Sequence, residues 1–335
     1  MKTYNLCFAG FGNVGRALAS LLHKKKDDLR GGYGIAWRIT GVASRRLGWL
    51  VEPEGFAVDR LLSGNKLTGG QSEHGIRDWL KAAQADIFFE MTPLNRKNGE
   101  PAISHLRAAL EHGAHAISAN KGPIVYAYDD LRQLAKTKNR RFLFESTVMD
   151  GVPIFSMFRD SLPALHVRSF RAILNSTTNV VLDQIEQGAD FAQAVRKAQE
   201  LGVAESDPSD DLEGWDSAVK IAALIIAVLG APIKLDEIAR QGINQLSPDM
   251  IRVARNSARP YKLICRAQRE DSGRARASVA PEQLEPGDPL AFVNGTSSAI
   301  YFESDIFPGL AITEMHPGIE ATAYGLLTDF VRAVS

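Results

Sequence analysis

YNLCFAGFGNVGRALASLLHK, residues 4 to 24, decides the fold that this sequence predicts. Tyr4–Ala9 is a short apolar strand, and a glycine-rich loop and an amphipathic helical pattern follow it directly. A GxGxxG spacing between a strand and a helix is typical of a loop that binds the pyrophosphate of a dinucleotide at the helix N-terminus. A glycine-rich turn without a ligand is the alternative. We expect the whole loop to bind cofactor: Gly10, Phe11, Gly12, Asn13, Val14 and Gly15.

The end of the second predicted strand, Ile35–Ala43, is where such domains select the ribose of the cofactor. An NAD-specific site has an acidic residue there, whereas this chain has Ser44, Arg45 and Arg46. A hydroxyl group and guanidinium groups suit a 2′-phosphate, so NADP is the preferred cofactor and NAD the second choice. Alternatively, both arginines point to solvent.

Two further apolar strands are followed by polar residues. Asp86–Glu90 leads to Thr92, and His115–Ser118 leads to Lys121. Ligands bind at the carboxyl ends of parallel strands, so Thr92 and Lys121 are candidate binding residues. The Gly-Pro pair after Lys121 contains helix breakers that we expect to fix its position.

The strand and helix pattern divides the chain into two domains and a last helix. A strand at Arg141–Glu145 closes a dinucleotide-binding domain of residues 1–145, in which residues 47–80 are predicted to be irregular. Residues 146–317 mix helices with alternating strands, as in an α+β domain. The sequence leaves open whether the C-terminal helix in 318–335 returns to the nucleotide domain. The predicted class is α/β, with an N-terminal Rossmann doubly wound parallel sheet and a C-terminal α+β domain.

The acidic segment LGVAESDPSDDLEGWDSAVKIAALIIAVL, residues 201 to 229, predicts a reactive lysine. We expect one helix that has Asp210 and Asp211 in its first turn. Asp216 and Lys220 are four residues apart and share a face, and the apolar run after Lys220 takes the helix into the core. A buried ammonium group has a movable pKa, as a proton donor requires. The alternative is an ordinary surface ion pair, worth less than ~1 kcal/mol.

Composition narrows the class of protein. The chain has 39 basic and 39 acidic residues, so nothing favours binding to nucleic acid or to an anionic membrane. Cys7 and Cys265 are expected to be reduced core thiols. Because we see no signal peptide and no segment of membrane-spanning length, we expect a cytoplasmic protein. Three histidines could form a metal cluster, but the sequence favours a plain helix surface for them. They are His105, His112 and His115.

Five motifs make the chain resemble the homoserine dehydrogenase family over nearly its whole length. They are GFGNVG at Gly10–Gly15, ANKGP at Ala119–Pro123, ESTVMDGVP at Glu145–Pro153, ILNSTTN at Ile173–Asn179 and AQELGVAESDPSDDLEGWDSAVK at Ala198–Lys220. The resemblance implies reversible reduction of L-aspartate 4-semialdehyde to L-homoserine with NAD(P)H, on the route to threonine and methionine. It also implies a small-molecule substrate and a homodimer formed through residues 146–317, the catalytic and dimerisation domain. A fused kinase or a regulatory ACT domain is not expected.

The resemblance also assigns roles to single residues. Lys220 is implied as the proton donor, with Asp216 orienting it or the substrate, and Lys121 as the lysine near nicotinamide and substrate. Glu205 matches the carboxylate that binds the substrate's ammonium group. Asp211 and Thr177 are expected nearby, and Thr92 on the nicotinamide side of the cofactor.

A monovalent cation, Na⁺ or K⁺, is implied at the loop of residues 145–153. By match its ligands are backbone carbonyls of Val148, Asp150 and Val152, with Glu145 nearby. The sequence departs from the family pattern at this loop, where Met149 and Asp150 replace small residues, and also at Ala172, Ser176 and His316-Pro317, where glycine is common. Two alternatives stay open: a paralogue that binds NADP without turnover, and a dehydrogenase of a related amino-containing carbonyl compound.

Overall fold

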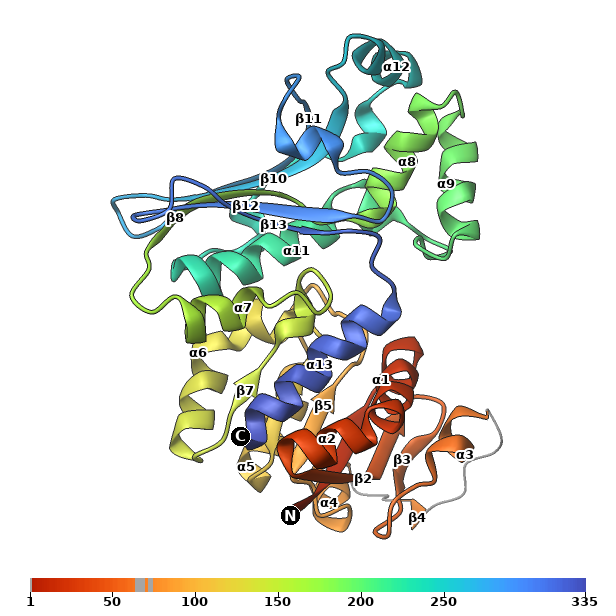
Figure 1. Cartoon of the computed structure of the whole chain (residues 1–335), viewed down its shortest axis with the longest axis vertical. Helices are drawn as coiled ribbons and strands as arrows, with labels where there is room; N and C mark the ends of the chain where they lie inside the picture. Colours follow the sequence, from red (N-terminus) through yellow and green to blue (C-terminus); the bar gives the residue numbers. More distant parts are fainter. Residues whose placement is uncertain (1, 64–69, 72–74) are drawn as a thin grey trace. The chain divides into compact units, whose positions relative to one another are not determined.

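Figure 1 shows the computed structural model of the chain, which describes residues 2–63, 70–71 and 75–335. The chain forms two compact units. The first unit contains Met1–Ser156 together with Gly318–Ser335, and the second contains Met157–Pro317. The C-terminal helix, which the sequence left unassigned, thus belongs to the first unit.

The first unit is built on a sheet with the order β4-β3-β2-β1-β5-β6-β7 among the described residues. Its strands are β1 (Lys2–Ala9), β2 (Ile35–Ser44), β3 (Gly48–Val51), β4 (Gly70–Gln71), β5 (Ile87–Glu90), β6 (His115–Ser118) and β7 (Phe142–Leu143). From β2 to β7 all neighbours are parallel, and β3 and β4 extend the β2 edge in antiparallel fashion. The carboxyl ends of β1, β2 and β5 therefore lie at one edge of the sheet, where a doubly wound fold binds its ligand.

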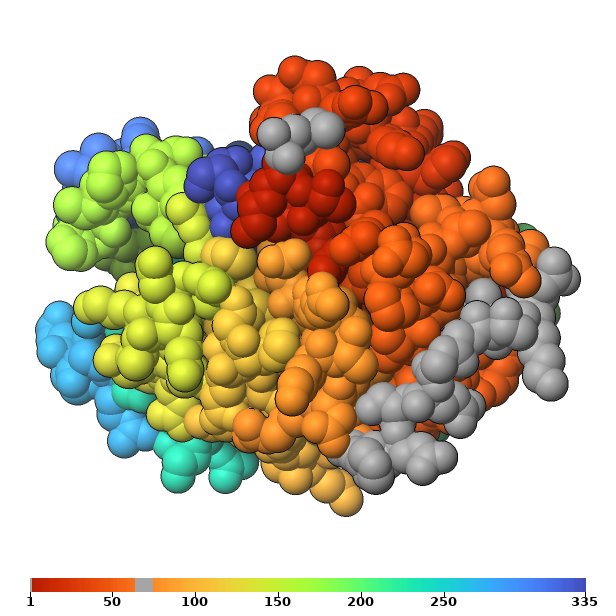
Figure 2. Space-filling model, turned by 90° about the horizontal axis from the view of Figure 1, so that it is seen from below, coloured from red at the N-terminus to blue at the C-terminus, as the bar shows by residue number. Residues whose placement is uncertain are grey.

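Helices cover this sheet, and its core is apolar. They are α1 (Asn13–Lys24), α2 (Lys26–Tyr33), α3 (Val58–Leu62), α4 (Ile76–Ala82), α5 (Ala102–His112), α6 (Gly122–Thr137), α7 (Ile154–Ser156) and α13 (Ile319–Val334). α13 runs beside α1 (Figure 1). Its Phe330 has no exposed surface and meets Tyr4 and Phe89 edge-on, with ring centroids 6.0 and 6.4 Å away. Figure 2 shows the dark blue C-terminal residues next to the dark red N-terminal strand.

The second unit is an α+β layer. Its strands are β8 (Val167–Ile173), β9 (Ala239–Arg240), β10 (Tyr261–Arg269), β11 (Ala275–Gln283), β12 (Ser298–Ser304) and β13 (Leu310–Glu314), in the order β13-β12-β8-β10-β11-β9. All pairs are antiparallel except β9 with β11. Its helices are α8 (Ser176–Glu186), α9 (Phe191–Glu200), α10 (Ser209–Leu212), α11 (Trp215–Leu224) and α12 (Pro248–Asn256).

The predicted fold class is confirmed, because a parallel doubly wound sheet precedes an α+β unit. Three local predictions are wrong. Residues 47–80 contain β3, α3 and α4 and are not irregular throughout. The strand predicted at Arg141–Glu145 is paired only at Phe142–Leu143, and Glu145 begins a short 3-10 helix. The Gly-Pro pair after Lys121 starts α6, since proline is tolerated in the first turn of a helix.

The single helix predicted in the acidic segment is two helices. α10 ends before Gly214, whose φ of +82° is left-handed, and α11 begins at Trp215. Gly214 faces Val279, which a Cβ at this position would approach to 3.1 Å. Left-handed backbone and a close neighbour both favour glycine, so this residue separates the two helices.

Two expectations drawn from the composition can also be compared with the structure. Cys7 and Cys265 are both free and fully buried, and burial raises the pKa of each thiol to about 12. Both cysteines therefore stay protonated and unreactive at neutral pH. Among the described residues, no helix has the length and apolar character needed to cross a bilayer.

Candidate active site

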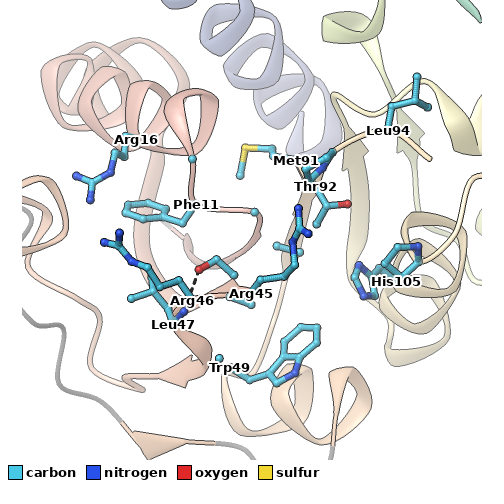
Figure 3. A pocket seen from close by; sticks show the side chains of 18 of the residues that line it. Phe11, Arg16, Arg45, Arg46, Leu47, Trp49, Met91, Thr92, Leu94 and His105 are labelled. Carbon is cyan, nitrogen blue, oxygen red and sulfur yellow. Dashed lines mark hydrogen bonds between the residues drawn. The ribbon is translucent and has the colours of Figure 1, made fainter. Parts of the chain in front are cut away.

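A cavity of about 1130 Å³ opens at the carboxyl ends of β1, β2 and β5 in the first unit (Figure 3). The glycine-rich loop, the β2–β3 connection and the segment after β5 all border it. Its size suits a dinucleotide.

The glycine-rich loop has the backbone that a dinucleotide site needs. Gly10 has a φ of +93°, and a Cβ there would clash with the Met91 carbonyl. Gly12 borders the cavity, and Asn13, Val14 and Gly15 begin α1. α1 starts without a side-chain cap and without an acidic residue in its first turn. Its first amides can therefore bind phosphate, so the loop fits the cofactor that the sequence implies.

The predicted ribose selector also borders this cavity. Ser44, Arg45 and Arg46 all line it. Figure 3 shows Arg46 on the side of Phe11, whereas Arg45 extends across the cavity toward Thr92. The Ser44 hydroxyl oxygen accepts a hydrogen bond from the Leu47 amide at 3.1 Å, and this bond fixes the turn after β2. Two guanidinium groups thus reach different parts of the cavity wall.

Thr92 lines the cavity, and its position is fixed by a carboxylate that the sequence analysis did not predict. The Glu90 carboxylate, with no exposed surface, accepts hydrogen bonds from the Thr92 amide at 2.8 Å and from its hydroxyl. Its other oxygen pairs with His105 Nδ1 at 2.8 Å. The interpretation of His105 as a helix-surface residue is wrong, because its side chain is only 12 % exposed and borders the cavity. Within the described residues, no group of three or more potential ligands could hold a metal ion.

Lys121 precedes α6 in the same unit and follows a buried asparagine. Asn120 donates from its side chain to the Thr92 carbonyl at 3.0 Å and accepts from the Gly122 amide at 2.9 Å. It therefore ties the segment after β5 to the segment after β6. The sequence gives no signal for this role beyond the ANKGP motif itself.

The second unit brings Lys220 and Asp216 together on α11. Lys220 Nζ lies 2.9 Å from Asp216 Oδ2 and donates to the Leu174 carbonyl at 2.6 Å. The side chains are 20 % and 21 % exposed, so both are largely buried but still accessible. A carboxylate and a carbonyl oxygen both accept from the ammonium group and fix its position. This geometry is compatible with the proton donor that the sequence predicts.

Asn175 and Thr177 connect a second carboxylate to this pair. The Asn175 amide donates to Asp211 at 2.6 Å and to Asp216 at 3.1 Å, and the Thr177 hydroxyl lies 3.0 Å from Asp211. Burial, and next the charge of Asp216, raise the pKa of Asp211. Asn175 also caps α8, accepting from the Thr178 amide at 2.8 Å. An asparagine between a strand and a helix was the available signal for it.

Glu205 is not part of this cluster. It lies in the exposed turn after α9, where its backbone carbonyl accepts from the Gln199 side chain at 3.1 Å. The hydrogen bonds of the described residues do not link it to Asp211 or Asp216. The sequence-predicted substrate residues are therefore brought together only in part.

The loop of residues 145–153 is fixed by α13. Glu145 is 1 % exposed and accepts hydrogen bonds from the Phe155 and Ser156 amides and from Arg332. The Asp150 carboxylate accepts from the Thr322 hydroxyl at 2.5 Å. The Val152 carbonyl accepts from the Ile154 amide, whereas in the described part of the chain no turn or loop amide donates to the carbonyl of Val148 or Asp150.

Comparisons with known proteins give matches along nearly the whole chain. A family model described as "Homoserine dehydrogenase, NAD binding domain" matches residues 10–145, and one described as "Homoserine dehydrogenase" matches residues 153–331. A relative from Pseudomonas canavaninivorans named "NAD(+)-dependent homoserine dehydrogenase" is 36 % identical, over 99 % of this chain and 96 % of its own. A putative homoserine dehydrogenase from Archaeoglobus fulgidus is similar in structure, with a TM-score of 0.86, 26 % identity and 98 % of both chains covered.

A further solved structure concerns the cofactor. It is that of a hyperthermophilic archaeal homoserine dehydrogenase in complex with NADPH. Its TM-score is 0.82 at 25 % identity, with 99 % of this chain and 98 % of that chain covered. Since both family models and these relatives extend along the chain, the resemblance is not confined to the glycine-rich loop.

Proposed function

The chain belongs to the homoserine dehydrogenase family, and on that premise we propose which of its residues perform the reaction. The protein is an NAD(P)-dependent oxidoreductase that interconverts L-homoserine and L-aspartate 4-semialdehyde, in the synthesis of threonine and methionine. The observation that carries the proposal is the Lys220 ammonium group, held between the Asp216 carboxylate and the Leu174 carbonyl.

Lys220 is the general acid and base of the proposed mechanism. A nicotinamide cofactor held at the cavity would supply the hydride for reduction of the substrate or accept it in the oxidation. In reduction this creates negative charge on the former aldehyde oxygen, which must receive a proton. Lys220 Nζ gives that proton and takes it back in the oxidation, while Asp216 holds Nζ in place. Lys121 has a supporting role, stabilising developing negative charge near the nicotinamide.

Asp211 and Asp216 form an acidic site for the substrate's ammonium group. Asn175 bridges the two carboxylates, and Thr177 fixes Asp211, so the pair is oriented before a ligand arrives. Two carboxylates close together stabilise a cation that binds between them. Glu205 joins the substrate site only if the turn after α9 moves, since it is exposed on that turn.

For the cofactor we propose NADP over NAD. The support is the chemistry after β2, where Ser44, Arg45 and Arg46 border the cavity. A guanidinium group binds a 2′-phosphate through charge-assisted hydrogen bonds. We propose this contact for Arg45, which would have to turn back from Thr92, with Arg46 on the Phe11 side as the second candidate. In this proposal the Gly10–Gly15 loop and the first turn of α1 would hold the pyrophosphate, and Thr92 would hold the nicotinamide side.

A monovalent cation remains a proposal that rests on backbone carbonyls. Glu145 already accepts three hydrogen bonds, one of them from the Arg332 guanidinium, so we give it a structural role in the loop. The carbonyls of Val148 and Asp150 are the better ligands for a hard cation, with Val152 as the third. No step of the proposed reaction depends on this ion.

The remaining expectations concern assembly and location. We propose a homodimer formed through the second unit, whose antiparallel sheet offers a face for pairing with its copy. We also propose that the enzyme works in the cytoplasm, in keeping with a biosynthetic role. Gel filtration with light scattering tests the dimer directly.

Homoserine oxidation by the purified protein tests the proposed mechanism. Lys220→Ala should lower kcat by about 10²- to 10⁴-fold, because it removes general acid-base catalysis, and cofactor binding should stay unchanged. Lys234→Ala is the matched control, since that lysine precedes an exposed 3-10 turn of the same unit, and kcat should not change. Turnover of Lys220→Ala equal to that of the wild type contradicts the role.

Arg45→Ala separates the two cofactors. We expect a higher KM for NADP, by about tenfold or more, and little change for NAD, because only NADP has the phosphate that Arg45 binds. Arg46→Ala measures the other guanidinium in the same way. Equal losses with both cofactors reject the 2′-phosphate contact.

A further inference from the structure

Lys262 is a buried lysine of the second unit that the proposed mechanism does not use. It lies on β10 and is 1 % exposed. Its Nζ donates to the side-chain oxygens of Asn179 at 3.0 Å, Asp183 at 3.0 Å and Asn294 at 2.9 Å. A lysine ammonium group has three N–H donors and no acceptor, so every donor has a partner here. Lys262 therefore fixes the direction of all three side chains.

Two of these partners lie on the helix that reaches the acidic substrate site. Asn175 is the N-cap of α8, and Asn179 and Asp183 follow it at steps of four residues. Residues four apart face the same side of a helix, so these three form one polar stripe along α8. Asn175, at the end of the stripe, bridges the two carboxylates of the acidic site. The contact of Nζ with Asn179 is thus about one helical turn away from that site.

The segment before β12 holds the same stripe from a second side. The Gly295 amide donates to the second oxygen of Asp183 at 2.6 Å, and the Gly295 carbonyl accepts from the Asn179 side chain at 3.0 Å. The Ser176 hydroxyl donates to the Thr296 carbonyl at 3.1 Å, at a position where glycine is common in the family. α8 is therefore tied both to β10 and to this segment.

The ion pair of Lys262 with Asp183 adds orientation more than stability. The Asp183 side chain is 13 % exposed, and the cost of removing two charges from water offsets much of their attraction. Apolar side chains already bury α8 in the core: Val180, Val181, Leu182 and Ile185. Apolar burial is non-directional, however, whereas the hydrogen bonds of Lys262 fix the rotation of α8 about its axis and its position along it.

We propose that Lys262 is a positioning residue for the substrate site. By holding Asn179 and Asp183, it keeps Asn175 and Thr177 in the orientation in which they fix the two carboxylates for the substrate's ammonium group. It acts through these side chains and not by contact with the substrate. This role rests on the acidic substrate site proposed above, and it makes selectivity for an amino group depend on a residue outside that site.

Two competitive inhibitors measure recognition of the ammonium group separately from the rest of the site. L-2-Aminobutanoate is homoserine without its hydroxyl group, and butanoate lacks the amino group as well. The ratio of their inhibition constants against homoserine therefore reports the ammonium contact alone. The wild type should bind butanoate about tenfold more weakly than L-2-aminobutanoate, and Asp211→Asn should bring the ratio closer to one.

Lys262→Met replaces the lysine by an apolar side chain of similar length. The inhibitor ratio should fall severalfold and the KM for homoserine should rise about tenfold, whereas the KM for the cofactor, whose proposed site is in the first unit, should not change. Lys262→Met/Asp183→Asn removes both charges, so that no buried charge is left unpaired, and the ratio should fall there too. A merely structural role lowers the melting temperature and leaves the ratio unchanged when each variant is assayed well below its melting temperature.

Lys197→Met is the matched control, on α9 of the same unit. Lys197 is 48 % exposed and pairs with Glu200 at 3.2 Å, so the inhibitor ratio of this variant should match that of the wild type. A wild-type ratio in either folded Lys262 variant overturns the proposal. If the wild type itself does not distinguish the two inhibitors, the acidic substrate site of the proposed function is wrong, and Lys262 has no ammonium contact to position.

Discussion

Asp211 links the stability of the fold to pH, and it is also the carboxylate proposed to bind the substrate. Burial and the nearby Asp216 charge raise the pKa of Asp211 in the folded protein. The folded state therefore holds this proton to a higher pH than the unfolded state does. The contribution of Asp211 to stability consequently falls as the pH rises from the unfolded pKa through the folded pKa.

Asp211→Asn should accordingly stabilise the protein at neutral pH while weakening homoserine binding. The gain in free energy of unfolding should develop as the pH rises from the unfolded pKa, near ~4, through the raised folded pKa. It should vanish well below pH ~4, where the carboxyl group is neutral in both states, and denaturant unfolding from about pH 3 to pH 8 measures this. Asp207→Asn is the control of opposite sign, since hydrogen bonds from Ser209 lower the pKa of Asp207. A stability difference for Asp211→Asn that does not vary with pH contradicts the argument.

At the scale of single residues, the sequence predicts contacts between residues that are close along the chain. Asp216 and Lys220 are four residues apart on a helix, and that spacing alone places them together. Glu90 could not be assigned from its neighbours, because its partner His105 comes from the next helix and its strand is otherwise apolar. Asn175 was part of a recognised motif, yet its bonds to Asp211 and Asp216 depend on how α8, α10 and α11 pack.

At the scale of elements, the break at Gly214 shows what periodicity misses. Apolar periodicity continues through the acidic segment, so the pattern predicts one helix. A single left-handed residue ends α10 and lets α11 start in a new direction, with Asp216 in its first turn. The same limit explains residues 47–80, since β3 and the short α3 are held by tertiary contacts rather than by a strong local pattern.

Gly214→Ala should destabilise the second unit by about 1–2 kcal/mol, because alanine is strained at this φ and its Cβ approaches Val279. It should also lower kcat, since α11 bears Asp216 and Lys220. Urea unfolding and steady-state kinetics measure the two effects. Gly32→Ala in α2 is the control: its Cβ meets nothing within 4 Å, and we expect a gain of about 0.5–1 kcal/mol. A Gly214 variant as stable as the wild type would falsify this account of the break.

At the scale of the whole molecule, the sequence predicts the class of each unit because each unit has its own pattern of strands and helices. The strand, loop and helix at residues 4–24 indicate a parallel sheet, and the parallel pairing of β1 with β2 and β5 confirms it. The unit against which the last helix packs could not be predicted, because an amphipathic helix fits any apolar surface. Its place beside α1 is fixed by contacts across the length of the chain, such as that of Phe330 with Tyr4.

The closure of the first unit by α13 gives the last prediction. Phe330→Ala should destabilise that unit by about 3–5 kcal/mol, because it empties a fully buried aromatic site between β1 and β5. Tyr324→Ala, on the same helix but 50 % exposed, should change stability by less than about 0.5 kcal/mol. The cofactor identifies the relevant transition in thermal unfolding, since a ligand raises the melting temperature of the unit that binds it.

Phe330→Ala should therefore lower the same transition that bound cofactor raises. If it instead lowers a transition that cofactor leaves unchanged, α13 does not belong energetically to the nucleotide-binding unit. If Phe330→Ala lowers the cofactor-sensitive transition and Tyr324→Ala does not, the two ends of the chain, far apart in sequence, jointly stabilise the cofactor site.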